Sequence, residues 1–254
     1  MVQSQTKACE KRRLRLFCVG LPKSGTHSIA AIFATRFRSA HEPGFEKCIQ
    51  IILDRSSHMI DGAQVLAHLK ERDSVMQLDM ESSHALAFLA PELVYAFPES
   101  RFILTVRHPL AWLRSQINHH ITNRQPAAGS ARMRFRDLKF HSDFTHPPEE
   151  LPLRNQGVYT LDGYLSYWAF HINSLIQIIP KEQLLILRVE HIAGSLPRIA
   201  SFSGISAAEL DGSKVHEYSL PKTFDILAQL NQSYLDSKIE RHCGQIVAKY
   251  FHAV

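Results

Sequence analysis

Short apolar runs alternate with helical patterns along most of the chain. Nearly continuous apolar runs predict buried strands, and they span Leu14–Val19, Ser74–Met80, Arg101–Val106 and Leu184–Val189. Between and after these runs, apolar residues recur at helical spacing, which predicts helices near residues 26–37, 45–53, 61–72, 82–97, 109–121, 161–179, 195–203 and 234–251. Strands that alternate with helices favour a mainly parallel sheet covered on both faces. The sequence therefore predicts an α/β fold with three layers, α/β/α.

The segment 123–159 interrupts this alternation. It is polar and basic, contains four prolines and has no sustained period. A long segment of this kind inside a compact domain is typical of a functional lid or binding loop. The segment contains a basic run of four residues, Arg132, Arg134, Arg136 and Lys139. This run predicts either a solvated loop or a surface that closes over an anion. Because no linker or repeat divides the chain, we predict a single domain over residues 1–254.

Composition and charge narrow the possible classes of protein. At 254 residues with 45% apolar content, the chain is long enough to bury one sizeable core. The net charge of +5, together with 15 histidines, favours an anionic ligand. Lysines and arginines are spread along the chain rather than clustered, so the sequence predicts no nucleic-acid partner.

Neither a leader nor a membrane span is predicted. The first 20 residues are basic and lack the apolar stretch of a signal peptide. No run approaches the about 20 apolar residues that a membrane-spanning helix needs. The four cysteines lack metal-ligand spacing and read as reduced thiols. We therefore expect a cytoplasmic protein with no metal site and no membrane partner; no pattern bears on its oligomeric state.

The loop after the first predicted strand has the form of a phosphate-binding loop. Ligands of parallel sheets collect at the carboxyl ends of the strands, where "GLPKSGTHS" begins at Gly20. Gly20 and Gly25 have the spacing of the ATPase pattern, but that pattern places its lysine directly after the second glycine. Here the lysine is Lys23, inside the loop. Glycines and a following helix start favour close approach of an anion; an ordinary strand–turn–helix corner is the alternative.

"PKSGTHS" resembles the 5′-phosphosulfate loop of sulfotransferases that use 3′-phosphoadenosine 5′-phosphosulfate (PAPS). A second motif of that family is an arginine that ends a later strand, with a serine eight residues on; "FPESRFILTVRHPLAWLRS" has it as Arg107 and Ser115. The resemblance continues through "YLSYWAFHINSLIQIIPKEQLLILRVEHI" and covers residues 14–251. It implies a P-loop-like phosphosulfate loop and metal-independent transfer of a sulfuryl group from PAPS to a hydroxyl, with adenosine 3′,5′-bisphosphate (PAP) as product.

The resemblance also implies roles for single residues. Lys23 would neutralise the charge that develops on the bridging oxygen as the sulfuryl group leaves. Arg107 and Ser115 would hold the 3′-phosphate, which separates this donor from ATP; the planar fork of arginine suits phosphate. Without the resemblance, Arg107 reads as a surface ion pair and Ser115 as a solvent-facing serine. The remaining loop residues would bind the 5′-phosphosulfate group, mostly through backbone amides: Pro22, Ser24, Gly25, Thr26, His27 and Ser28.

Transfer to a hydroxyl also needs a group that takes the acceptor's proton. We expect this base after the second predicted strand, in "LDMESSH", where Asp79 and Glu81 share a face if the strand continues. Cytosolic sulfotransferases use a histidine in this region and other branches use a glutamate. Glu81 is the first choice, followed by His84 and then Asp79. Glu42 and His41, in the predicted turn before residue 45, are weaker candidates.

Two other functions fit parts of the pattern. A P-loop kinase would use ATP and Mg²⁺, and "SVMQLDM" imitates the apolar strand that ends in a magnesium-binding aspartate. The position of Lys23 and the Arg107–Ser115 pair oppose a kinase. A non-catalytic nucleotide-binding protein with the same fold is the second alternative. For the sulfotransferase, we expect a small-molecule hydroxyl acceptor, for example in secondary metabolism, with segment 123–159 as lid or acceptor-binding loop.

Overall fold

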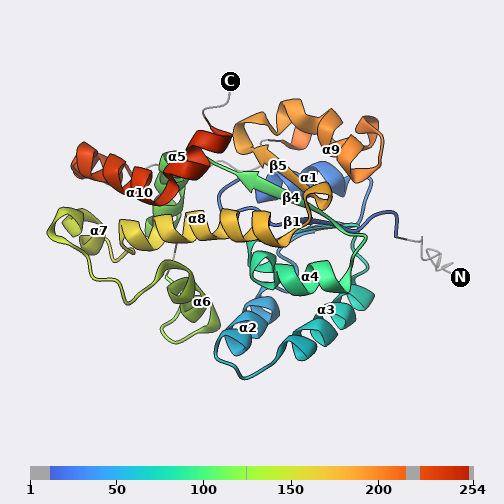
Figure 1. Cartoon of the computed structure of the whole chain (residues 1–254), viewed down its shortest axis with the longest axis horizontal. Coiled ribbons are helices and arrows are strands. Elements are labelled where there is room, and N and C mark those ends of the chain that lie inside the picture. The colour runs from blue at the N-terminus through green and yellow to red at the C-terminus, as the bar shows by residue number, and fades with distance from the viewer. Residues whose placement is uncertain (1–11, 124, 216–223, 252–254) are drawn as a thin grey trace, which may run out of the picture.

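Five parallel strands form one sheet at the centre of the molecule (Figure 1). The computed structural model describes residues 12–123, 125–215 and 224–251. The strand order is β2-β3-β1-β4-β5, and the register pairs Phe17 of β1 with Glu81 of β3 and with Phe102 of β4. The strands are β1 Leu16–Cys18, β2 Ser39–His41, β3 Met80–Ser82, β4 Arg101–Val106 and β5 Leu184–Arg188.

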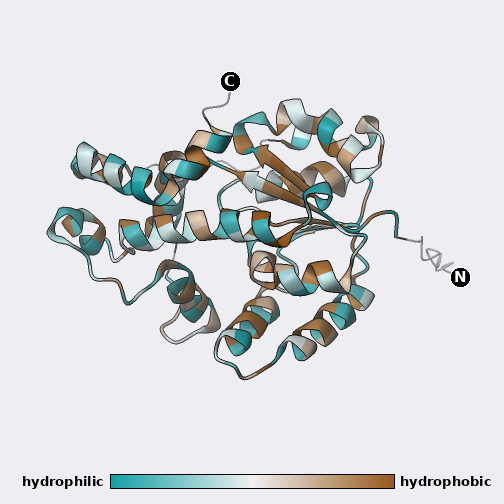
Figure 2. Cartoon of the chain, viewed as in Figure 1, coloured by the Kyte–Doolittle hydropathy of each residue, from teal (hydrophilic) through white to brown (hydrophobic). Residues whose placement is uncertain are grey.

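Helices cover both faces of the sheet. Neighbouring strand residues face opposite sides, so Leu16 and Ile103 join one apolar cluster, with α1 and α9, while Phe17 and Phe102 join another, with α4 and α8. Figure 2 shows the hydrophobic strands at the centre and hydrophilic residues on the outer sides of the helices. The three-layer α/β/α prediction is therefore confirmed. The helices are α1 Thr26–Ala34, α2 Phe45–Ser56, α3 Gly62–Met76, α4 Ala90–Ala96, α5 Pro109–Thr122, α6 Ala131–Phe140, α7 Leu151–Asn155, α8 Leu161–Ile178, α9 Leu196–Ser203 and α10 Gln232–Tyr250.

Three of the four predicted strands are confirmed, as β1, β4 and β5. The prediction of a strand at Ser74–Met80 is wrong, because Ser74–Met76 belong to α3. A capping box between Asp61 and Gln64 starts that helix, and it continues until Gln77 adopts a left-handed conformation. The strand of this region, β3, begins only at Met80. β2 escapes prediction because its half-buried residues form no apolar run.

The segment 123–159 contains more regular structure than its pattern predicts. It includes α6 and α7, and α6 packs against α2 and α8. Phe135 and Phe140 on α6 are buried in the main apolar cluster. The local signal for α6 is Ser130, whose hydroxyl caps the helix by accepting a hydrogen bond from the Met133 amide. The helical period of α6 is concealed because a polar residue, Lys139, is buried beside Phe140 while the apolar Leu138 is exposed.

The expectations about a leader and about Cys9 concern residues that the structure does not describe. Residues 1–11, whose composition underlies the expectation of no leader, lie outside the described residues, as does Cys9. Within the described part, no helix is long and apolar enough to cross a bilayer. The described cysteines Cys18, Cys48 and Cys243 are free and buried.

Candidate active site

The loop between β1 and α1 is tied firmly to β4. The buried Ser24 hydroxyl donates to the Leu21 carbonyl at 2.6 Å and lies 2.9 Å from the Thr105 hydroxyl. Gly20 approaches the same threonine so closely that an added Cβ would come within 1.9 Å of Thr105 Oγ1. The Ser24 amide also donates to the Leu21 carbonyl, at 3.2 Å, so both the side chain and the amide of Ser24 fix the shape of the loop. Lys23 and Gly25 both have positive φ, at 64° and 88°.

The amino end of α1 has the features of an anion site. Gly25 occupies the N-cap position, no side chain among the described residues caps the helix, and its first turn contains no acidic residue. The free amides and the helix dipole both favour a negative charge there. Thr26 and Ser28 are buried, and the exposed His27 ring stacks on His41 with ring centroids 3.5 Å apart.

Arg107 follows β4 and lies beside the same loop. Its Nη1 donates to the Lys23 carbonyl at 3.2 Å. Burial, and secondly the charge of Arg107, lower the pKa of Lys23; burial also lowers the pKa of Arg107. Burial disfavours the charge of both side chains, and the charge of Arg107 adds to this at Lys23, so a bound anion would stabilise both cations. Ser115 lies half-buried in the second turn of α5, the helix that begins just after Arg107.

Two tryptophans fix this arrangement from the other face of the sheet. Trp112 of α5 donates through Nε1 to the Pro22 carbonyl at 2.8 Å. Trp168 of α8 donates to the Arg107 carbonyl at 3.1 Å. Both side chains are fully buried, so α5 and α8 hold the loop and Arg107 in register with each other.

Glu81 lies in an ion pair rather than in an open site. Both carboxylate oxygens accept hydrogen bonds from Arg72 at 2.5 Å, and the two side chains are 5% and 11% exposed. The pair is surrounded by apolar residues such as Leu69 and Phe97. Burial raises the pKa of Glu81, and the guanidinium opposes this shift. With both oxygens engaged, Glu81 has no free atom for an acceptor's proton.

Asp79 lies at the opposite edge of the sheet from the donor loop. It directly precedes β3 and accepts hydrogen bonds from the backbone amides of Arg13 at 2.7 Å and of Arg38 at 3.1 Å. The loop of Lys23 follows the carboxyl end of β1, which is parallel to β3. The structure therefore does not bring Asp79 to the loop, either as a base or as the magnesium ligand that a kinase would need.

His84 lies between side chains from two other segments. Its Nδ1 is 2.6 Å from Glu42 Oε1, after β2, and its Nε2 is 3.2 Å from Lys139 Nζ, on α6. Burial raises the pKa of Glu42, but the hydrogen bond with His84 and the attraction to that residue outweigh burial. The pKa of Glu42 is therefore lowered to about 2. Burial, and then the charge of Lys139, lower the pKa of His84. A neutral histidine whose Nδ1 faces a carboxylate is a suitable general base.

Comparison with known proteins identifies the family. A family model described as a sulfotransferase domain matches residues 15–199, which include the Lys23 loop, Arg107 and His84. The chain belongs to the sulfotransferase family. A crystal structure of a sulfotransferase from Alicyclobacillus acidocaldarius is similar with a TM-score of 0.49 and 16% identity, over 92% of this chain and 96% of that chain. No curated protein matches the sequence.

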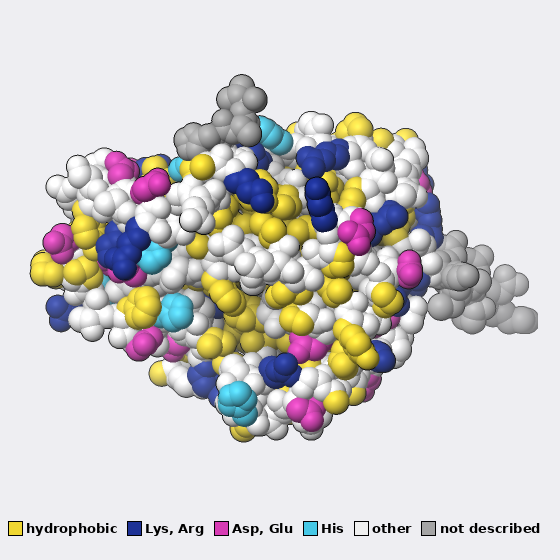
Figure 3. All heavy atoms as spheres, viewed as in Figure 1, with side chains coloured by type: hydrophobic (Ala, Val, Ile, Leu, Met, Phe, Trp, Pro, Cys, Tyr) yellow, Lys and Arg dark blue, Asp and Glu magenta, His cyan; other side chains and the backbone are white. Residues whose placement is uncertain are grey.

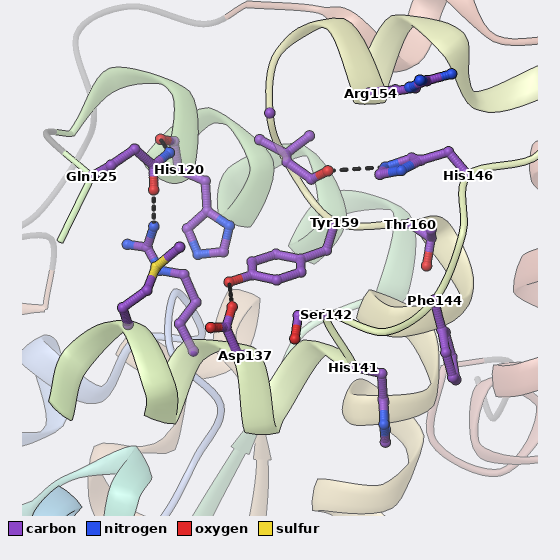
Figure 4. Close-up of a pocket in the computed structure, with 14 residues that line it drawn as sticks. His120, Gln125, Asp137, His141, Ser142, Phe144, His146, Arg154, Tyr159 and Thr160 are labelled. Carbon is purple, nitrogen blue, oxygen red and sulfur yellow. Dashed lines mark hydrogen bonds between the residues drawn. The ribbon is translucent and has the colours of Figure 1, made fainter. Parts of the chain in front are cut away.

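This sulfotransferase has a cavity of about 260 Å³ in the segment 123–159 (Figure 4). Tyr159 reaches toward α6 and donates to Asp137 at 2.6 Å, beside His120 of α5. Arg136 of α6 and Phe144 also line the cavity. Its mixture of aromatic and cationic side chains suits a small polar ligand.

A larger open groove, of about 690 Å³, follows β5 on the outer edge of the sheet. Leu184 and Ile186 of β5 line it together with Ile179, and Arg188 and Lys249 are among its basic residues. Figure 3 shows apolar surface between lysine and arginine side chains on this face. Because Val106 also lines the groove, one end of it adjoins Arg107.

Proposed function

We propose that the protein transfers a sulfuryl group from PAPS to a hydroxyl of a small-molecule acceptor, without a metal ion. The observation that carries the proposal is the meeting of Lys23 and Arg107 at the uncapped amino end of α1. An anion with two separated phosphate positions fits two cations that lie beside the same loop. Within the described residues, no group of three or more histidine, cysteine or carboxylate side chains could hold a metal.

The proposed roles follow the positions of the residues. The amides of Gly25, Thr26, His27 and Ser28 bind the 5′-phosphosulfate group at the helix start, and Ser24 holds the loop in shape beside it. Lys23 stabilises the charge that develops on the leaving oxygen. Arg107 and Ser115 hold the 3′-phosphate, with Arg107 as the main contact. The donor's adenosine extends toward the end of the groove at Val106.

For the base, the geometry favours His84 over Glu81. His84 is oriented by Glu42, whereas both oxygens of Glu81 are bound to Arg72. A positioned histidine with a carboxylate partner is a common arrangement for removing a proton from a hydroxyl. We therefore assign proton removal to the His84–Glu42 pair.

Three broader expectations belong to the same proposal. Residues 1–254 form one domain, and the segment 123–159 acts as a lid that carries part of the acceptor site, with its cavity beside Tyr159. The enzyme works in the cytoplasm on small molecules. The net charge of +5 suits the anionic donor of such a reaction.

Ligand-induced stabilisation tests the proposal against a kinase. PAP at 100 times its Kd should stabilise the protein by about 2.7 kcal/mol, and EDTA should leave that effect unchanged. ATP with Mg²⁺ should stabilise it much less, because Arg107 would lack its phosphate. Stronger stabilisation by ATP with Mg²⁺ would favour the kinase. Stabilisation by PAP without any turnover of PAPS would favour a non-catalytic binding protein.

A further inference from the structure

A buried amine from the lid segment contacts the proposed base. Lys139, on α6, is only 8% exposed, and its Nζ lies 3.2 Å from His84 Nε2. Since Nδ1 of the same ring lies against Glu42, the three side chains form a continuous chain. Its members come from the segments after β2 and β3 and from α6. The last residue of the basic run, which the pattern reads either as a solvated loop or as a surface that closes over an anion, thus contacts the proposed base.

The surroundings of this amine favour its neutral form. Nζ lies 4.7 Å from the ring centre of Phe135 and 5.1 Å from that of Phe140. Burial lowers the pKa of Lys139 to about 7, an effect that the charge of Glu42 opposes and that of Arg136 strengthens. The ionisable groups around the amine come from every neighbouring element and are Glu42, His84, His119 and His120 of α5, Arg136 of α6, and Tyr167 and His171 of α8.

A second observation is an unpaired polar group beside the amine. The Tyr167 ring lies 5.7 Å from Lys139 Nζ, and its buried hydroxyl has no hydrogen-bond partner among the described residues. Buried hydroxyls are almost always paired. A hydroxyl of the acceptor, placed near Lys139, would supply the missing partner.

We propose that Lys139 is a catalytic residue that takes the proton from the acceptor hydroxyl and passes it to His84. This inference rests on the proposed function and refines it, because the proton reaches the His84–Glu42 pair through Lys139 and not directly from the acceptor. The acceptor oxygen forms a bond to sulfur while the bond between sulfur and the phosphate oxygen breaks, and the leaving PAP keeps that electron pair. The acceptor proton moves to the lone pair of neutral Lys139, and a proton then moves from Nζ to His84 Nε2. Glu42 balances the positive charge that reaches the imidazole ring.

The mechanism has a defined pH dependence. The reactive form of Lys139 is the neutral amine, so the rate should rise as pH increases through about 7, the pKa of that group. A purely structural lysine would leave this limb of the profile unchanged when it is replaced.

The experiment uses PAPS as donor and water or added phenol as hydroxyl acceptor, with PAP release as the measure of turnover. Lys139→Met fills the same space without a lone pair, and Lys139→Arg keeps a charge but releases no proton near neutral pH. Both should reduce kcat by about 10²- to 10⁴-fold and remove the limb near pH 7, while the Kd for PAP stays unchanged. Lys70→Met, at an exposed lysine of α3, is the matched control and should behave as wild type.

Rescue gives an independent measurement. In Lys139→Ala, added ethylamine should restore part of the lost turnover by occupying the vacated space. Wild-type turnover in Lys139→Met or Lys139→Arg would overturn the role of Lys139 and leave the sulfotransferase proposal intact. A wild-type protein that binds PAP but never turns over PAPS would overturn the enzyme proposal, and the role of Lys139 with it.

Discussion

The Glu81–Arg72 ion pair allows stability and catalysis to be separated in one variant. In Glu81→Gln, the neutral amide replaces a carboxylate whose oxygens both lie 2.5 Å from the guanidinium. The pair is nearly buried, at 5% and 11% exposure, so the substitution leaves an Arg72 charge without its partner. Breaking a buried pair in this way costs about 3–5 kcal/mol. For 254 residues, unfolding entropy corresponds to about 2 °C per kcal/mol, so Tm should fall by about 6–10 °C.

Urea unfolding followed by circular dichroism measures the loss of stability, and PAPS turnover per folded molecule measures catalysis. We expect Glu81→Gln to keep turnover close to wild type. The double variant Glu81→Gln/Arg72→Met should recover much of the stability, because both charges are then absent. The reasoning is refuted if Glu81→Gln has wild-type stability and turnover lower by about 10²-fold or more, the size expected for loss of a general base. Glu81 would then be the base, as the sequence pattern alone favours.

Two further predictions concern the donor site. Arg107→Ala should weaken PAP binding by about 1.5–3 kcal/mol, the scale of a charged hydrogen bond, and barely change binding of adenosine 5′-phosphosulfate, which lacks the 3′-phosphate; calorimetry that finds equal losses for both would reject the assigned contact. Lys23→Ala should reduce kcat far more than PAP affinity, because its main partner is charge that develops in the transition state. Poor PAP binding with normal kcat at saturation would contradict that role.

The sequence predicts local structure well where a pattern lies within one element. β4 is a continuous apolar run between turns, and the structure confirms it at Arg101–Val106. Ser74–Met80 misleads because the same apolar residues serve the end of α3. In that case a distant start signal, the capping box at Asp61, decides between helix and strand.

Most of the site features that the sequence pattern does not predict are contacts between residues that are distant in the sequence. Glu42 and His84 meet because β2 and β3 are neighbours, and β2 has no apolar signal. Lys139 reaches the same histidine because Phe135 and Phe140 anchor α6 in the core, inside a segment that reads as irregular. The sequence favours Glu81 over His84 in "LDMESSH", and the contacts of Arg72 with Glu81 and of Glu42 with His84 reverse that order. Such contacts depend on packing between elements rather than on spacing within one.

The donor loop is held in a conformation that its own residues disfavour. Lys23 has φ of 64°, in the left-handed region, where a side chain of this kind costs on the order of 1–3 kcal/mol. Arg107 and Trp112 hold the loop by donating to the carbonyls of Lys23 and Pro22, and the Ser24 hydroxyl fixes it to Leu21 and to β4. These contacts use carbonyl oxygens and leave the amides at the start of α1 to a ligand. The fold therefore compensates the strain without a ligand, and in the proposed reaction the loop would need no rearrangement when charge develops on the leaving oxygen.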